Sequence, residues 1–238
     1  MKERNVIIST VLIFSLLCYF GIAHIRNDIR SVFSFETDNK TVFVIDAGHG
    51  GEDSGTIAVD GTLEKDINLE IALKTAAFFD IFGIEYVLIR TDDRSIGDTS
   101  LETIRKRKAS DINKRYEIIN SYPDSVLLSI HQNYFPDNKY SGCQVFYSDN
   151  LPESEILANI IQNKIVSSLQ KNNTRKIKES DNSIFLLDKA KRPSVMIECG
   201  FLSNNNELLL LKESEYQTSL AYFITSAVID YNNQSEDD

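Results

Sequence analysis

Short apolar runs alternate with longer amphipathic stretches along most of the chain. Apolar, β-rich runs short enough to be buried strands lie at residues 42–45, 86–89, 126–130, 143–147 and 195–197, with weaker candidates at 175–179 and 184–187. Apolar residues recur at helical spacing over residues 63–82, 101–120, 154–169 and 216–231. This alternation predicts an α/β fold in three layers: a mixed, mostly parallel sheet of about six strands, with helices on both faces.

The first 40 residues differ from the rest of the chain. Residues 6–23 carry no charge, and as a helix they would be about 27 Å long, close to the ~30 Å apolar thickness of a bilayer. Lys2 and Arg4 precede this run, which predicts that the rest of the chain lies outside the cytoplasm. We therefore expect a transmembrane helix within residues 1–25, with a cleaved signal segment as the alternative. The remainder divides into a tether, one domain and an acidic tail, at residues 26–40, 41–232 and 233–238.

Composition narrows the functions open to the chain. Its 238 residues carry a formal net charge of −10, which argues against nucleic-acid binding through bulk charge. The basic stretch at residues 105–108 is predicted to be a solvated helix face, because no aromatic residues are interleaved with it. Beyond the N-terminal segment, Cys143 and Cys199 permit one disulfide. A domain of this size needs no such cross-link, so buried free thiols are expected.

Three residues suited to metal chemistry follow closely on three of the predicted strands. They are His49, His131 and Glu198. In an open α/β sheet, strand ends of this kind converge on one edge, where ligands bind. Two imidazoles and a carboxylate at that edge predict a metal centre. A hydrogen-bonded structural role is the alternative for a single histidine, but here two of only three histidines follow predicted strands.

Glu64, at the start of the first predicted helix, is the candidate for a third ligand. A catalytic zinc site usually takes three protein ligands and leaves one position for water. The alternative for Glu64 is to favour the helix macrodipole. The glycines beside His49 let the backbone approach a ligand closely. They could instead cradle phosphate, but Gly48-x-Gly50-Gly51 lacks the spacing of a dinucleotide loop and no Gly-Lys-Ser/Thr follows.

Four motifs taken together resemble a known family. They are Asp46-Ala47-Gly48-His49-Gly50-Gly51-x-Asp53-x-Gly55, Glu64-Lys65-Asp66-x-Asn68-Leu69, Ser129-Ile130-His131-x-Asn133 and Glu198-x-Gly200-Phe201-Leu202-Ser203-Asn204. In this order they are similar to the zinc-dependent N-acetylmuramoyl-L-alanine amidases of the type 3 amidase family. The resemblance implies that residues 41–232 form a zinc amidase domain acting on peptidoglycan. It further implies Zn²⁺ held by His49, Glu64 and His131, with Glu198 as the catalytic carboxylate.

The same resemblance implies hydrolysis of the amide that joins the lactyl group of N-acetylmuramic acid to L-alanine. Asn133 and Arg90 are the candidates for substrate binding. The alternative for Asn133 is to close the turn after His131, and the alternative for Arg90 and Arg115 is a structural ion pair. Asp46 has two candidate roles, orienting a metal ligand or capping the glycine loop.

A finer resemblance is to the germination-specific amidases of endospore-forming bacteria. It rests on residues 107–111 and 144–147 and on the short path from His131 to Cys143. This resemblance implies cutting of the spore cortex so that muramic-δ-lactam can form, a step needed for germination. It places the enzyme at the extracytoplasmic face of the membrane, in the cell wall or the intermembrane space of the developing spore. An accessory protein partner is left open.

Three alternatives remain at the level of sequence. A vegetative cell-wall amidase of the same family would carry the same four residues. A zinc carboxypeptidase-like enzyme would use the same ligand types, but would need a group that binds a free C-terminal carboxylate. A non-catalytic peptidoglycan-binding module anchored in the membrane would need no metal, and the intact set of four residues argues against it.

Overall fold

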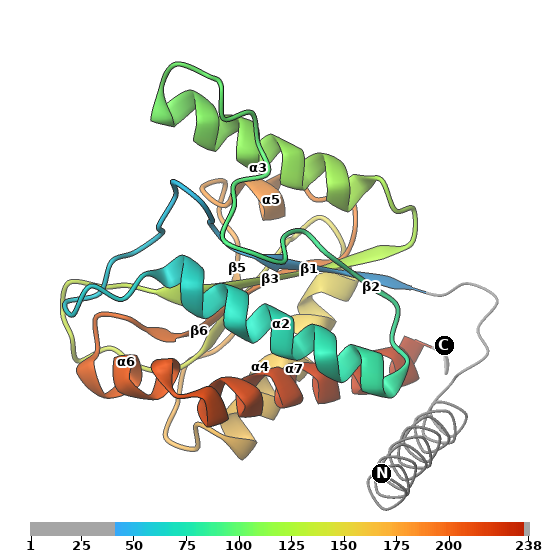
Figure 1. Cartoon of the computed structure of the whole chain (residues 1–238). Coiled ribbons are helices and arrows are strands. Elements are labelled where there is room, and N and C mark those ends of the chain that lie inside the picture. Colours follow the sequence, from blue (N-terminus) through green and yellow to red (C-terminus); the bar gives the residue numbers. More distant parts are fainter. Residues whose placement is uncertain (1–40, 236–238) are drawn as a thin grey trace, which may run out of the picture.

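Six strands form one mixed sheet in the computed structural model, which describes residues 41–235 (Figure 1). The strand order across the sheet is β2-β1-β3-β6-β4-β5. Their bounds are β1 Val42–Ala47, β2 Tyr86–Leu88, β3 Ser125–Asn133, β4 Gln144–Tyr147, β5 Lys178–Glu179 and β6 Ser194–Phe201. The predicted mixed, mostly parallel sheet is confirmed.

Strand direction determines which residues meet at each edge of the sheet. β1, β2, β3 and β6 run parallel to one another, whereas β4 runs antiparallel to β6. The carboxyl ends of β1, β3 and β6 therefore lie at one edge, together with the beginning of β4. His131 and Glu198 are register partners on adjacent strands, and Gln144 is the partner of Glu198 on the other side.

Helices cover both faces of the sheet, so the predicted three layers are present (Figure 1). One face packs against α2 Glu64–Phe82, α4 Pro152–Ser168, α6 Asn205–Lys212 and α7 Ser214–Ser235. The other is covered by α3 Ile104–Asn120 and α5 Phe185–Asp188. Phe43 and Ile45 point into the first core and Val44 into the second. Burial on both faces explains why the central strands are continuous apolar runs.

Some of the predicted elements differ from the structure. Of the weak strand predicted over residues 175–179, only Lys178–Glu179 is formed, as β5. The other weak strand, predicted over residues 184–187, is not formed: residues 185–187 belong to α5 and Ile184 is its N-cap residue. Leu186 and Leu187 are both buried in the core under α3, which a short helix allows and an alternating strand does not. Helix α3 begins at Ile104 and not at 101, because the Thr103 side chain accepts a hydrogen bond from the backbone N–H of Lys106 and caps the helix there.

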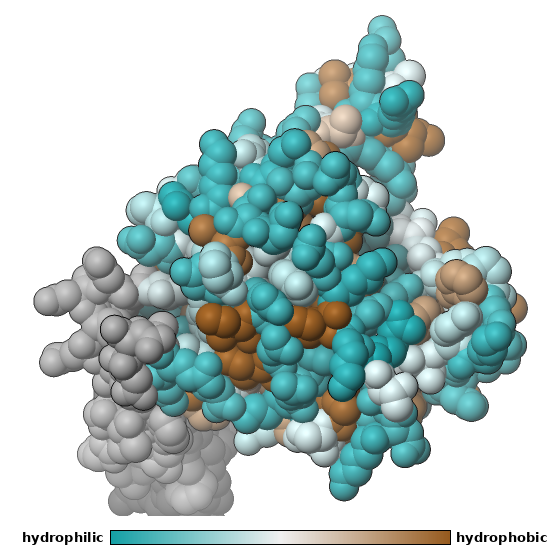
Figure 2. All heavy atoms as spheres, turned by 180° about the vertical axis from the view of Figure 1, so that it is seen from behind, coloured by the Kyte–Doolittle hydropathy of each residue, from teal (hydrophilic) through white to brown (hydrophobic). Residues whose placement is uncertain are grey.

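The predicted membrane anchor and tether, residues 1–40, lie outside the described residues. Within residues 41–235, no helix is both long and apolar enough to cross a membrane. Cys143 and Cys199 are buried and free, as predicted. Seen from behind, the surface is mostly hydrophilic with separate apolar patches, in keeping with a net charge of −10 (Figure 2).

Candidate metal centre

The loop after β1 presents His49 in a strained backbone conformation. His49 has φ of 64°, the left-handed region that non-glycine residues rarely adopt. Strain of this kind is found mainly at functional sites. Gly48 is packed so closely on His131 that a Cβ there would lie 2.2 Å from the His131 ring. The loop can therefore bring the two imidazoles together only because residue 48 has no side chain.

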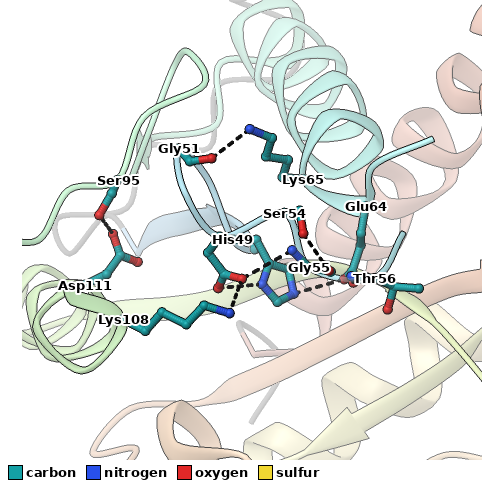
Figure 3. A network of polar contacts seen from close by, with 12 residues as sticks. His49, Gly51, Ser54, Gly55, Thr56, Glu64, Lys65, Ser95, Lys108 and Asp111 are labelled. Atoms are coloured by element: carbon teal, nitrogen blue, oxygen red, sulfur yellow. Dashed lines mark hydrogen bonds and ion pairs between the residues drawn. The ribbon is translucent and has the colours of Figure 1, made fainter. Parts of the chain in front are cut away.

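Glu64 is fixed against this loop by the start of α2. The backbone N–H groups of Glu64 and Lys65 donate to the carbonyls of Thr56 and Ser54, so the first turn of the helix is anchored to the loop that follows His49. The Thr56 N–H donates in turn to Glu64 Oε2 at 2.8 Å. The Gln132 N–H donates to Glu64 Oε1 at 3.1 Å. Figure 3 shows Glu64 beside the ring of His49.

The three predicted ligands converge on one point. Glu64 Oε1 lies 3.2 Å from His49 Nε2 and 3.1 Å from His131 Nδ1. One ligand atom from each of the three residues lies within 4.8 Å of the others. Two imidazole nitrogens and one carboxylate oxygen match the donors of catalytic zinc and leave a coordination position open. The residues present therefore fit a zinc ion.

Asp53 orients His49. Its Oδ2 lies 2.9 Å from His49 Nδ1, which leaves Nε2 facing Glu64. Burial lowers the pKa of His49, but hydrogen bonds to Asp53 and Glu64 outweigh it and raise that pKa to about 9. Lys108 reaches the same aspartate, with Nζ 2.6 Å from Asp53 Oδ1 (Figure 3). The site thus favours a positive charge on or at the imidazole, which either a proton or a metal ion provides.

The Glu64 carboxylate is ionised at the centre of this cluster. Burial raises its pKa, but the hydrogen bonds and charges of His131 and His49 outweigh burial and hold the pKa well below its usual range. Asn68 adds a further donor, with Nδ2 3.3 Å from Glu64 Oε1 and 3.2 Å from the carbonyl oxygen of Gly48. The ionised carboxylate and the two imidazole nitrogens beside it are the oxygen and nitrogen donors that a zinc ion takes.

Glu198 lies near the cluster, and one of its carboxylate oxygens has no hydrogen-bond partner among the described residues. It is half-buried on β6, directly opposite His131. Its Oε2 is buried and has no hydrogen-bond partner among residues 41–235. Burial raises the pKa of Glu198 to about 7, against the opposing charge of His131. A carboxylate with this pKa can both accept and release a proton at neutral pH.

The comparison with known families decides what kind of site this is. The family model described as N-acetylmuramoyl-L-alanine amidase matches residues 43–230. The chain belongs to this amidase family. Its four sequence motifs all fall inside the matched range, and the metal-donor cluster lies at the sheet edge where they meet.

Relatives of this amidase are similar over the whole domain or the whole chain. The germination-specific N-acetylmuramoyl-L-alanine amidase of Bacillus subtilis is 33% identical, covering 100% of this chain and 99% of the relative. The CwlD amidase of Clostridioides difficile, solved in complex with the GerS lipoprotein, has a TM-score of 0.78 and 38% identity. That match covers 82% of this chain and 99% of the solved one. The amidase AmiC2 of Nostoc punctiforme has a TM-score of 0.69 and 27% identity over 83% of this chain and 99% of its own.

Arg115 of the amidase holds the His49 loop from α3. Its Nη1 donates to Asp46 Oδ1 and, at 2.9 Å, to the carbonyl oxygen of Ala47. Its Nη2 donates to the carbonyl oxygen of His49 at 2.5 Å. Nε lies 2.7 Å from Asp111 Oδ2. Arg115 therefore forms structural ion pairs with Asp46 and Asp111, the alternative to substrate binding, and Asp46 belongs to this structural network.

Arg90 lies under the same loop. It is 1% exposed, and its guanidinium donates to the carbonyl oxygens of Ala47, Gly48, Lys65 and Asp92. Arg90 was predicted to bind substrate, with an ion pair as the alternative. The structure instead assigns it to holding backbone carbonyls, because the loop carbonyls between β1 and His49 have no strand partner and need a donor.

Asn133, the other substrate-binding candidate, ends β3 on the strand that carries His131 and is half-buried. Asp53 and Asn68 have no role predicted from the sequence, although both occur in the four motifs. Asp53 is four residues after His49 and Asn68 is four residues after Glu64, and this spacing could have indicated that they support the predicted ligands. Their contacts with the ligands appear only in the folded chain.

Proposed function

We propose that this amidase is zinc-dependent and hydrolyses the bond between the lactyl group of N-acetylmuramic acid and L-alanine during maturation of the spore cortex. The proposed catalytic activity depends on one observation: His49, Glu64 and His131 lie together, and Glu198 is the register partner of His131. His49, Glu64 and His131 would hold Zn²⁺. When bound, zinc supplies Lewis-acid polarisation of the amide carbonyl and an acidified water.

Glu198 is proposed as the proton carrier. Its unpartnered Oε2 accepts a proton from the attacking water, and the same carboxyl then delivers the proton to the departing nitrogen of L-alanine. A pKa of about 7 suits both halves of this transfer. Proton transfer of this kind contributes about 10²- to 10⁴-fold to rate. Asn133, on the same face of the sheet as His131, is proposed to bind the substrate beside the scissile bond.

The spore-specific role is supported by likeness over the full length of a relative. The germination-specific amidase of Bacillus subtilis matches this chain from end to end, including residues 1–40. We propose that residues 1–25 anchor the chain in the membrane, that 26–40 form a tether, and that the catalytic domain acts outside the cytoplasm. An accessory lipoprotein is a proposed partner, since the similar CwlD amidase was solved in complex with one.

One biochemical experiment tests the activity. Residues 27–238 are incubated with purified cortex and vegetative peptidoglycan, with Zn²⁺ or with a chelator, and the products are identified by mass spectrometry. We expect zinc-dependent release of intact stem peptides with a free L-alanine amine. Release of a C-terminal amino acid would indicate a carboxypeptidase, and metal-independent binding without products would indicate a wall-binding module.

A second experiment tests the place of action. A deletion strain of the source organism is sporulated, and its cortex is analysed for muramic-δ-lactam. The proposal requires that the lactam be absent and that the wild-type gene restore it, whereas a Glu198→Gln gene does not. Normal cortex combined with defective vegetative wall turnover would assign the enzyme to vegetative growth instead.

A further inference from the structure

Two polar residues, Gln144 and Arg175, lie beyond Glu198 on the side of β6 that faces away from β3. Gln144 is the register partner of Glu198 on β4. Side chains at paired positions project from the same face of a sheet. Arg175, from the segment between α4 and β5, donates through Nη2 to Gln144 Oε1. Gln144 Nε2 donates to the carbonyl oxygen of Lys176 at 2.8 Å, so the glutamine and the arginine are fixed together one strand from Glu198.

A bulge in β6 brings an aromatic ring to the same place. His131 pairs with Glu198 and Asn133 pairs with Phe201, so three steps along β6 match two steps along β3. A bulge reverses the face toward which the following side chains point, which turns Phe201 to the face that carries Glu198. The Arg175 guanidinium carbon lies 4.9 Å from the centre of the Phe201 ring. A contact of this kind holds the cation in a defined orientation.

Arg175 keeps unused hydrogen-bonding capacity in this position. Its Nε is buried and has no hydrogen-bond partner within residues 41–235. Its positive charge lowers the pKa of Glu198, although burial, which raises that pKa, has the larger effect. A guanidinium offers donors in a planar fork that matches a carboxylate. In a chain of net charge −10, a half-buried cation one strand away from Glu198 is suited to an anionic group of the substrate.

The proposed mechanism fixes which part of the substrate reaches Arg175. In that mechanism the lactyl carbonyl would lie at the cluster of His49, Glu64 and His131, and the departing nitrogen would lie at Glu198 on β6. The stem peptide therefore continues from Glu198 toward the start of β4. The proposal concerns stem peptides whose second residue carries a free α-carboxylate. That carboxylate is the first anionic group after the scissile bond.

We propose that Arg175 is a specificity-determining residue that binds the α-carboxylate of the second stem-peptide residue, with Gln144 and Phe201 positioning its guanidinium. This inference rests on the proposed amidase function and adds a substrate subsite to it. Arg175 touches the peptide at one residue from the reacting amide, so it acts on substrate selection and binding.

The test uses two muramyl tripeptides that differ only in the second residue, one with the free α-carboxylate and one with an α-amide. The zinc-loaded wild-type enzyme is expected to favour the acid by about tenfold in kcat/KM, the size of one charge-assisted hydrogen bond. Arg175→Gln should remove this preference, because it should raise KM for the acid by about tenfold more than KM for the amide. Arg175→Lys keeps the charge without the planar fork and should retain part of the preference.

Lys171→Gln is the matched control, because it removes the same charge from an exposed position on the same segment and should retain the preference. Circular dichroism and zinc content establish that each variant is folded and loaded. Equal rates of the wild type on both substrates, or an equal loss on both in Arg175→Gln, would overturn the inference. No hydrolysis of either substrate by the zinc-loaded wild type would refute the proposed function itself, and the inference with it.

Discussion

His49 Nδ1 lies 2.9 Å from Asp53 Oδ2, so an aspartate four residues along the same loop decides which imidazole nitrogen faces Glu64. The hydrogen bond from Nδ1 fixes the ring and its tautomer and leaves Nε2 free as a ligand. Carboxylate partners of this kind raise the basicity of a metal-binding histidine. The candidate ligand His49 and the carboxylate that orients it, Asp53, therefore both come from the loop after β1.

Asp53→Asn is expected to weaken zinc binding by about 10- to 100-fold while the fold is retained, because the neutral amide supports the imidazole less strongly. Zinc affinity is measured by competition with a chromophoric chelator. Glu52→Gln is the control, since Glu52 is the adjacent residue and pairs with Arg107 at the surface. Equal affinities for wild type and Asp53→Asn would show that this carboxylate does not support the metal.

Glu198→Gln is expected to retain zinc and to lose about 10²- to 10⁴-fold in kcat, because the amide can neither accept nor deliver the proton. His131→Ala should lose zinc and activity together, since it removes a ligand. Metal content by mass spectrometry and steady-state rates on muropeptides separate the two effects. Activity near that of the wild type in Glu198→Gln would require another base.

Removal of the metal is expected to lower the melting temperature. Binding to the folded state alone stabilises by about 4 kcal/mol when free zinc is about 1,000 times Kd, which is on the order of 10 °C for a domain of this size. Differential scanning calorimetry with and without chelator measures the change, and His131→Ala provides the control that should show no zinc-dependent shift. An identical shift in that variant would place the stabilising ion elsewhere.

Arg115→Met is expected to destabilise the metal-free protein by about 3–5 kcal/mol, because it leaves Asp46 as an uncompensated buried charge. Urea unfolding measures the loss. Adding Asp46→Asn to the variant should recover part of the stability. Lys106→Met, which removes an exposed pair with Glu102, should have little effect. If Arg115→Met changed stability no more than Lys106→Met, the buried pair would not anchor the loop.

Acid is expected to weaken the fold through Asp111. Burial on its own would raise the pKa of this residue, but Arg115 outweighs burial and holds the pKa below its ordinary value of 3.8. A lowered folded-state pKa means that the stabilisation is fully present above 3.8 and is lost as the pH falls below it. Asp111→Asn should therefore be less stable than wild type at pH 6 and approach it at pH 3. Urea unfolding in chelator at both values measures this, and a difference independent of pH would exclude the ion pair as its cause.

The outline of the fold could be predicted from the sequence because it depends on local burial. Strands covered on both faces are continuous apolar runs, and the helices that cover them repeat their apolar residues with helical spacing. The same principle placed His49, His131 and Glu198 at strand ends, and so at one edge. Residues 184–187 show the limit, because a short apolar run has no period that separates a strand from one helical turn.

What the sequence by itself determined was the α/β class, the amidase family and the four residues of the candidate centre. Only the tertiary structure decided which side chains fix the loop of that centre in place and which polar residues lie next to it. Arg115 meets the His49 carbonyl across 66 residues, and Arg175 meets Gln144 across 31. Such contacts depend on the strand order and on the reversed direction of β4, which follow from the packing of the whole chain and leave no repeating pattern in any one segment.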